Sequence, residues 1–207
     1  MLEEGLSKLG LSEDRIYELL IKYIKEIELF NQAYGLVKVS DRNELVVKHI
    51  LDSLAPLNIF LSLPNKKIAD VGSGAGLPGI PLAICMPDTE FTLIERMGRR
   101  AGFLRNALAV LGLSNVIVEE ADMEKLSVSE TDGFDLIVFR AFKPLNCGIL
   151  KGLLRLLGSG GSLTAYKGRR QTIEEEMNLL RETIHWEILP LEVPFLEEER
   201  HLVLIKE

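Results

Sequence analysis

Cysteine, histidine and tryptophan are scarce in this chain of 207 residues, which contains 2, 3 and 1 of them respectively. Cys85 and Cys147 lie far apart and form no C-x-x-C pair, so the sequence predicts neither a disulfide framework nor a zinc site. We therefore expect no metal cofactor. Cys147 follows Asn146 in a predicted helix, and we expect it to be a small buried helix residue rather than a nucleophile.

Long hydrophobic runs are also absent. The longest one, Leu77 to Pro87, is interrupted by two further prolines and a glycine and reaches about half the length of a membrane span. No basic and apolar leader opens the chain. With 47% apolar and 27% charged residues, the composition is that of one globular domain. We expect a soluble cytoplasmic protein without a membrane partner, and a monomer by default.

Positive charge is in deficit, because the net charge is −7, and this alone disfavours a nucleic-acid partner. The charge is unevenly distributed, however. Residues 96–170 hold 12 Lys and Arg against 7 Asp and Glu. A local basic face can bind phosphates even on an acidic protein. The alternative is that many of these side chains are ordinary solvated positions, so only those near a ligand-binding edge carry functional weight.

The most informative stretch is a short apolar strand that runs into three glycines. Gly72, Gly74 and Gly76 follow residues 68–71, and Pro78 suits the first turn of a helix after them. Glycines allow a tight turn and let the backbone approach a ligand. The free N–H groups of the following helix favour a carboxylate or phosphate. The stretch therefore predicts a cofactor loop, with a plain structural turn as the alternative.

Glycine spacing separates two cofactors. A dinucleotide fingerprint beginning at Gly72 requires glycine at position 77, where this chain has Leu77. Together with Asp70, the three glycines instead resemble the first motif of class I S-adenosylmethionine (AdoMet) methyltransferases, in which the acidic residue and loop backbone hold the methionine end. Glu95 ends the next predicted strand, close to the offset of about 20 residues at which a carboxylate meets ribose hydroxyls. A solvated carboxylate is the alternative for Glu95.

The chain order predicts an α/β protein with a doubly wound sheet. Helical periodicity predicts one helix over 12–34 and a second that starts at a capping box, Asp41 and Glu44, and continues to Pro56. We therefore expect a helical extension, residues 1–60, packed on a core domain, residues 61–207. Strands and helices then alternate, as in a parallel sheet with right-handed crossovers. Two final strands joined by a short acidic link predict an antiparallel hairpin. The expected strands are 68–71, 90–95, 116–119, 134–139, 161–166, 186–193 and 201–205, and the expected helices begin at Leu77 and cover 97–111, the vicinity of Met123, 144–157 and 171–183.

Several stretches in this order resemble one family, the bacterial 16S ribosomal RNA guanine-N7 methyltransferases, historically called glucose-inhibited division protein B. The resemblance extends from about Phe30 to the end of the chain. Two positions depart from the family pattern: Asp122 replaces an arginine, and Gly35-Leu36-Val37 replaces Asn-Leu-Thr. The stretches that carry the resemblance are His49–Leu54, Asp70–Leu82, Gly98–Arg105, Arg140–Phe142, Tyr166–Gly168 and Glu199–Lys206.

This resemblance implies a Rossmann-like AdoMet-dependent fold and methyl transfer to N7 of a guanine in 16S ribosomal RNA, free or in the small ribosomal subunit. The expected cofactor-binding residues are Asp70, Gly72, Gly74, Gly76, Leu77, Glu95, Met123, Glu124 and Arg140. The expected RNA contacts are Lys143, Lys167, Arg169, Arg170, Arg200 and His201.

Guanine N7 has an exposed lone pair and no proton to remove, so no general base is expected. Arg140 is assigned a positioning role, with a structural ion pair to Asp135 or a nearby acidic residue as the alternative. Phe142 could stack on a base or belong to the core. For His49, a local hydrogen bond to Asp52 is the simplest explanation.

Three other functions stay open at this point. The chain could methylate a small molecule or a protein, or it could bind AdoMet as a non-catalytic regulator. A nicotinamide oxidoreductase is disfavoured because Leu77 breaks the dinucleotide fingerprint and the chain closes with a hairpin.

Overall fold

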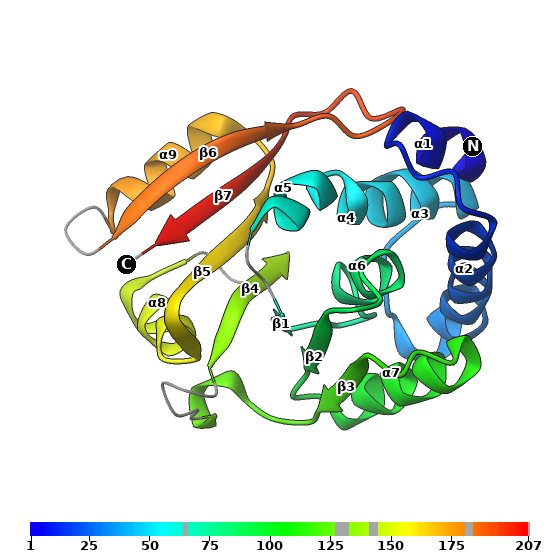
Figure 1. Cartoon of the computed structure of the whole chain (residues 1–207), viewed down its shortest axis with the longest axis horizontal. Helices are drawn as coiled ribbons and strands as arrows, with labels where there is room; N and C mark the ends of the chain where they lie inside the picture. The colour runs from blue at the N-terminus through cyan, green and yellow to red at the C-terminus, as the bar shows by residue number, and fades with distance from the viewer. Residues whose placement is uncertain (64–65, 127–132, 141–144, 181–183, 207) are drawn as a thin grey trace.

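The computed structural model describes residues 1–63, 66–126, 133–140, 145–180 and 184–206. Its strands form one sheet in the order β3-β2-β1-β4-β5-β7-β6 (Figure 1). Strands β1 to β5 are parallel, and β7 pairs antiparallel with both β5 and β6. The predicted doubly wound sheet with a closing hairpin is thus confirmed. The strands are β1 Lys67–Val71, β2 Glu90–Ile94, β3 Val116–Glu119, β4 Phe134–Arg140, β5 Leu157–Lys167, β6 His185–Leu191 and β7 Arg200–Lys206.

The N-terminal helices differ from the prediction in two places. Helix α1 was missed because it is too short for a clear period. The expected end at Pro56 is confirmed to within two residues, because that helical stretch ends at Leu54. The prediction missed the further helix that Pro56 then caps, a position that proline tolerates since its missing N–H has no helical partner there. The cap at Asp41 is confirmed, with its Oδ1 accepting the Glu44 N–H at 2.9 Å. The elements are α1 Leu2–Lys8, α2 Asp14–Tyr34, α3 Arg42–Leu45, the π-helical η1 Val46–Leu51, α4 Asp52–Leu54 and α5 Leu57–Ser62.

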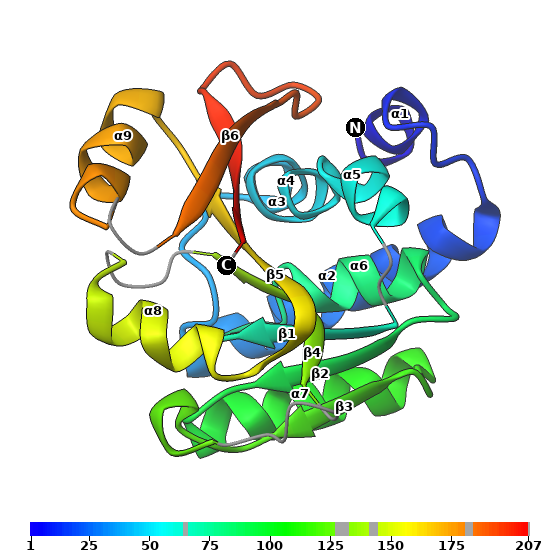
Figure 2. The ribbon, with the colours of Figure 1, turned by 60° about the vertical axis from the view of Figure 1, so that its left-hand side comes forward.

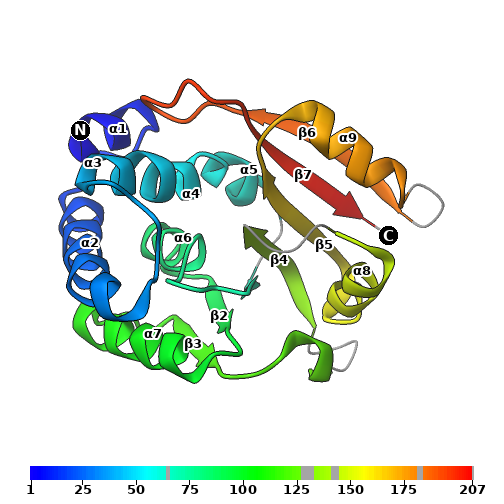
Figure 3. The same cartoon turned by 180° about the vertical axis from the view of Figure 1, so that it is seen from behind.

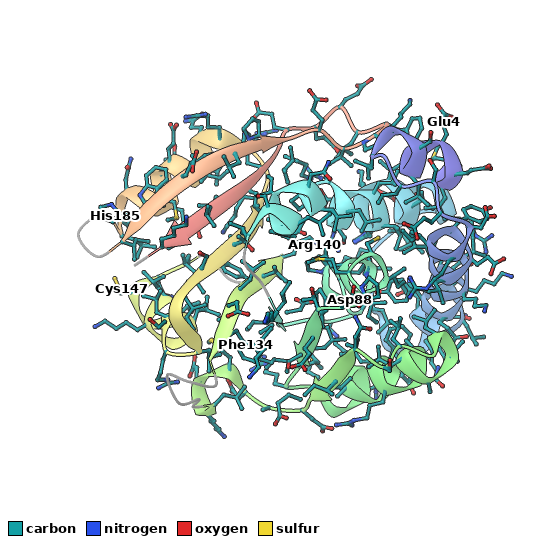
Figure 4. The ribbon with its side chains drawn as sticks, viewed as in Figure 1. Glu4, Asp88, Phe134, Arg140, Cys147 and His185 are labelled. Atoms are coloured by element: carbon teal, nitrogen blue, oxygen red, sulfur yellow. The ribbon has the colours of Figure 1, made fainter. Side chains whose placement is uncertain are left out.

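The crossover helices occur where alternation predicted them. They are α6 Gly79–Cys85, α7 Gly98–Leu111, the 3-10 turn η2 Met123–Lys125, α8 Cys147–Leu154 and α9 Arg170–Asn178. The expected burial of Cys147 is wrong, because this residue begins α8 and is exposed (Figure 4). Asn146 sets that start by accepting the N–H groups of Gly148 and Ile149. Phe142, Lys143 and Pro144 lie outside the described residues.

The two faces of the sheet carry separate apolar clusters. Strand residues alternate between them: in β4, Leu136 and Val138 pack on one face, and Ile137 and Phe139 on the other. In Figure 1, α2, α6 and α7 lie to one side of the sheet, and α8 and α9 lie to the other. Helices α1, α2, α4 and α5 belong to the same cluster as α6 and α7, so the N-terminal extension and the sheet share one core.

One helical stretch, Arg42–Ser62, is long and apolar enough to cross a membrane, with a mean hydropathy of 1.3 over its most apolar 18 residues. Of this segment, 61% is buried inside the protein. Figure 3 shows α3, α4 and α5 in line between α1 and the β5–β7 side of the sheet. The stretch is therefore a core helix of this fold.

Candidate active site at the carboxyl edge of the sheet

The glycine loop adopts the backbone conformation that its sequence demands. Gly72, Gly74 and Gly76 have φ angles of +74°, +59° and +88°, in the left-handed region that other residues avoid. At Gly76 a Cβ would also stand 2.5 Å from the Ile80 side chain. The loop therefore needs glycine for its shape, and at Gly76 it needs glycine for space as well.

Glu95 ties this loop to the end of β2. Its Oε2 accepts the Gly74 N–H and its Oε1 accepts the Met97 N–H, both at 2.9 Å. The side chain is almost fully buried, yet the residue lines a cavity. Each carboxylate oxygen has two lone pairs, so Glu95 can hold the loop and still accept hydroxyl groups from a ligand.

A cavity of about 270 Å³ opens beside the loop. Apolar side chains and the carboxyl groups of Glu95, Asp122 and Glu124 both contribute to its wall. This combination suits a nucleoside, with apolar surface for a base and carboxylates that accept hydrogen bonds from ribose hydroxyls. The lining residues are Val71, Gly72, Ile94, Glu95, Arg96, Met97, Arg100, Ala121, Asp122, Met123, Glu124 and Ile149.

Asp70 lies beneath the loop rather than in the cavity wall. It is 1% exposed, and its Oδ2 accepts the Gly79 N–H at 2.9 Å. Its Oδ1 has no hydrogen-bond partner among the described residues. Burial raises the pKa of Asp70 to about 7, although the Gly79 N–H works in the opposite direction. Through the Gly79 N–H, Asp70 ties the end of β1 to the start of α6 beneath the loop.

The N-terminal extension also contacts the loop. Tyr23, fully buried on α2, donates its hydroxyl to the Ala75 carbonyl at 2.6 Å. Burial raises the pKa of Tyr23 well above its usual value, so the hydroxyl keeps its proton and remains a donor. Sequence reasoning missed this contact, because Tyr23 looks like any other member of the apolar stripe of its helix.

A second hollow of about 410 Å³ lies along the same edge of the sheet. We call it the polar cleft. The N-terminal extension, β4, β5 and the β6–β7 hairpin all contribute to it, and Figures 2 and 3 show the hairpin beside α3 and α4. Its lining residues are Lys48, His49, Asp52, Arg140, Tyr166, Lys167, Gly168, Leu191, Arg200 and His201.

Arg140, at the tip of β4 (Figure 4), is held by the N-terminal helices. Its Nη1 donates to Asp52 Oδ2 at 2.9 Å and to the Lys48 carbonyl at 3.2 Å, and its Nη2 lies 3.0 Å from His49 Nδ1. The alternative of an ion pair with a nearby acidic residue is thus confirmed for Asp52. Asp135 is not that partner, since it accepts the N–H groups of Lys66 and Lys67.

His49 is neutral in this arrangement. An arginine can only donate, so the Nδ1 that faces Arg140 must be the unprotonated acceptor. Burial, with Arg140 nearby, lowers the pKa of His49 to about 4. The prediction that His49 bonds to Asp52 is wrong. Both side chains bond to the guanidinium of Arg140 instead, Asp52 to Nη1 and His49 to Nη2.

The remaining basic residues of the cleft rim are mostly paired. Lys167 Nζ lies 2.8 and 2.9 Å from the two carboxylate oxygens of Glu176. Arg200 Nε donates to Asp52 Oδ1 at 3.2 Å. His201 Nδ1 lies 2.6 Å from the Gly168 carbonyl and must donate, since a carbonyl only accepts. Two further predicted contacts lie nearby on the surface: exposed Arg169 caps α9, and exposed Arg170 pairs with Glu174 at 2.9 Å.

The strand order places the cavity and the cleft side by side. The loop after β1 and Glu95 after β2 form the cavity, while the ends of β4 and β5 and the start of β7 form the cleft. β4 lies between β1 and β5, so Arg140 at its end lies between the two hollows. Ligands of open α/β sheets bind at this edge.

Comparison with known proteins identifies the family. A family model described as rRNA small subunit methyltransferase G matches residues 16–203. The chain belongs to this family. Proteins named ribosomal RNA small subunit methyltransferase G from Treponema pallidum and Acinetobacter baumannii are similar to it, with 42% identity over 212 residues and 36% over 207. Each alignment covers 99% of this chain, and 92% and 96% of the respective relatives.

Solved structures agree on the fold. A SAM-dependent methyltransferase from Aquifex aeolicus matches with a TM-score of 0.58 and 16% identity, covering 88% of this chain and 97% of that one. A SAM-dependent O-methyltransferase from Thermotoga maritima matches with a TM-score of 0.56 and 16% identity, covering 89% and 71%. The protein is therefore an AdoMet-dependent methyltransferase with a class I fold, as the sequence predicted.

The cavity brings together four of the predicted cofactor residues, Gly72, Glu95, Met123 and Glu124. Three others do not line this cavity. Gly74 bonds to Glu95, Asp70 lies under the loop, and Arg140 lines the polar cleft. Gly76 and Leu77, at the end of the loop, are buried and do not line the cavity. The binding role of each residue stays a prediction. Among the described residues, no group of three or more His, Cys, Asp or Glu is placed to hold a metal ion.

Proposed function

We propose that this protein transfers a methyl group from AdoMet to N7 of one guanine in 16S ribosomal RNA, in the bacterial cytoplasm. The observation that carries the proposal is the position of the polar cleft beside the nucleoside-sized cavity, with Arg140 and Arg200 among its lining residues. Family membership names small-subunit ribosomal RNA as the substrate class.

In the proposed complex, Glu95 and Glu124 accept the ribose hydroxyls, and Met123, Ile94 and Ile149 surround the adenine. The loop backbone from Gly72 to Gly76 approaches the methionine end, above the buried carboxyl of Asp70. AdoMet supplies an electrophilic methyl group when it is bound.

The acceptor nitrogen needs no base, so the contribution of the protein is alignment. Guanine N7 carries a lone pair in the ring plane, and no proton leaves it on attack. The polar cleft must then hold the base with N7 facing the cavity, and holding two reactants in line contributes about 7 to 11 kcal/mol. Arg140 and Arg200 serve this alignment by contacting phosphate or base-edge oxygens, which arginine forks recognise well.

The test supplies labelled AdoMet to the purified protein with ribosomal RNA or small subunits from a strain that lacks the gene. We expect label in the RNA that appears as 7-methylguanosine after nuclease digestion. Activity should also fall steeply with salt, because phosphate contacts release counterions. Label in protein or in small molecules, with little dependence on salt, would instead support a different methyl acceptor. AdoMet binding without any transfer would support a regulator.

A further inference from the structure

Asp52 is a buried carboxylate in a mostly apolar helical stretch, and it bridges two arginines. Its side chain is 5% exposed, with Oδ2 2.9 Å from Arg140 Nη1 and Oδ1 3.2 Å from Arg200 Nε. The two partners lie 88 and 148 residues further along the chain. A carboxylate is costly to bury unless it is paired, so this position is explained by the two cations that it holds.

The bridge fixes the orientation of both guanidinium groups. Described residues engage three donors of Arg140, through Asp52, the Lys48 carbonyl and His49. An arginine has five donors in a planar fork, so fixing three of them also fixes where the others point. Arg200 is held in a similar way, by Asp52 at Nε and by the Glu199 carbonyl at Nη1.

The helix that carries Asp52 is itself anchored to the sheet. The next residue, Ser53, is fully buried and accepts the Tyr166 hydroxyl through its carbonyl at 2.8 Å. Tyr166 is opposite Arg140 in the β4–β5 register. Burial raises the pKa of Tyr166 well above its usual value, so its hydroxyl remains a donor. The Asp52 carboxylate therefore has a fixed position relative to the strand ends that form the polar cleft.

We propose that Asp52 is a positioning residue for the RNA substrate: it orients Arg140 and Arg200 in the polar cleft, so that the N-terminal extension is part of the substrate site. Asp52 does not contact the reacting atoms. The inference rests on the proposed function, because it assumes that the polar cleft receives RNA. It predicts that Asp52 affects alignment of the RNA and leaves the cofactor cavity unaffected.

The experiment compares wild-type protein with Asp52→Asn, which keeps the shape of the side chain and removes its charge. We expect the KM for RNA to rise and kcat/KM to fall by about ten- to hundred-fold, since small misplacements have effects of this size. The dissociation constant for AdoMet, measured by calorimetry, should stay within about twofold of wild type. Glu28→Gln is the matched control, because Glu28 is a carboxylate of the same extension that pairs with Arg42 away from the cleft. It should behave as wild type.

A double-mutant cycle separates positioning from a general structural role. If Asp52 acts through Arg200, then Asp52→Asn should change kcat/KM much less in an Arg200→Gln background than in wild type. Fully additive effects would overturn the proposal. Equal loss of AdoMet binding and RNA methylation in Asp52→Asn would also overturn it, because the role would then be structural.

Arg140→Lys provides a second variant if Asp52→Asn folds poorly. It keeps the charge next to Asp52 and loses the planar fork, so we expect the same rise in the KM for RNA. Wild-type kinetics in Arg140→Lys would show that orientation is unimportant and would overturn the proposal. Failure of the proposed function can be told apart from failure of the Asp52 proposal, because wild-type protein itself would then transfer no methyl group to RNA.

Discussion

Replacing Glu95 with glutamine tests how the cofactor cavity is built. In wild type, both carboxylate oxygens of Glu95 accept backbone N–H groups, those of Gly74 and Met97. A glutamine can accept only one of them, and its amide N–H₂ group then faces the other donor. Hydrogen bonds to charged groups contribute about 1.5 to 3 kcal/mol each. We therefore expect the free energy of unfolding of the apo protein to fall by about 2 kcal/mol.

Cofactor binding should weaken as well. The variant lacks the anionic acceptor for the ribose hydroxyls, and its loop is less firmly held, so the dissociation constant for AdoMet should rise at least about tenfold, which is 1.4 kcal/mol. Urea unfolding measures the first effect and calorimetry the second. Glu90→Gln is the control, since Glu90 is exposed at the start of the same strand and should change stability by less than about 0.5 kcal/mol.

The two readouts can refute the reasoning separately. Wild-type stability in Glu95→Gln would show that the two N–H contacts do not hold the loop. Reduced stability with an unchanged dissociation constant would restrict Glu95 to a structural role and remove it from the ribose site.

Three further predictions concern buried groups near the two hollows. The pKa of Asp70 is raised from 3.8 to about 7, so wild type should lose stability relative to Asp70→Asn as the pH rises from about 4 to 7, by up to about 4 kcal/mol in urea unfolding. The pKa of His49 is lowered from 6.5 to about 4, so here stability depends on pH in the opposite direction. The stability of wild type relative to His49→Gln should fall by up to about 3 kcal/mol as the pH drops from 6.5 towards 4. A stability difference that does not change with pH would contradict a neutral His49 ring. Tyr23→Phe removes the hydroxyl that holds Ala75 and should reduce stability by about 1 to 3 kcal/mol and weaken AdoMet binding; an unchanged melting curve would rule out this support of the loop.

Local sequence signals were enough for the sheet and the glycine loop. Alternating strands and helices give a parallel sheet, and three glycines at positions that need positive φ identify the loop. Glu95 could be found because its distance from Asp70 along the chain is set by one βα unit. These features depend on residues that are close in sequence.

The polar cleft depends on contacts that no local pattern encodes. Asp52 reaches partners on β4 and β7, and only the folded sheet brings these strand ends together. Its one local signal was a carboxylate within the apolar helical stretch around Ile50 and Leu54. The pairing of Lys167 with Glu176 was equally hidden, because it depends on how α9 packs back against the end of β5.

The most direct test of the account is to locate the methyl group in the RNA. 16S ribosomal RNA from a strain lacking the gene is incubated with the protein and AdoMet, and then treated with chemistry that cuts the strand at 7-methylguanine. The account predicts one new cut per molecule, which RNA from a strain that retains the gene already shows before incubation. With labelled AdoMet in the same incubation, label in the RNA without a new cut would place the methyl group on another atom and contradict the account.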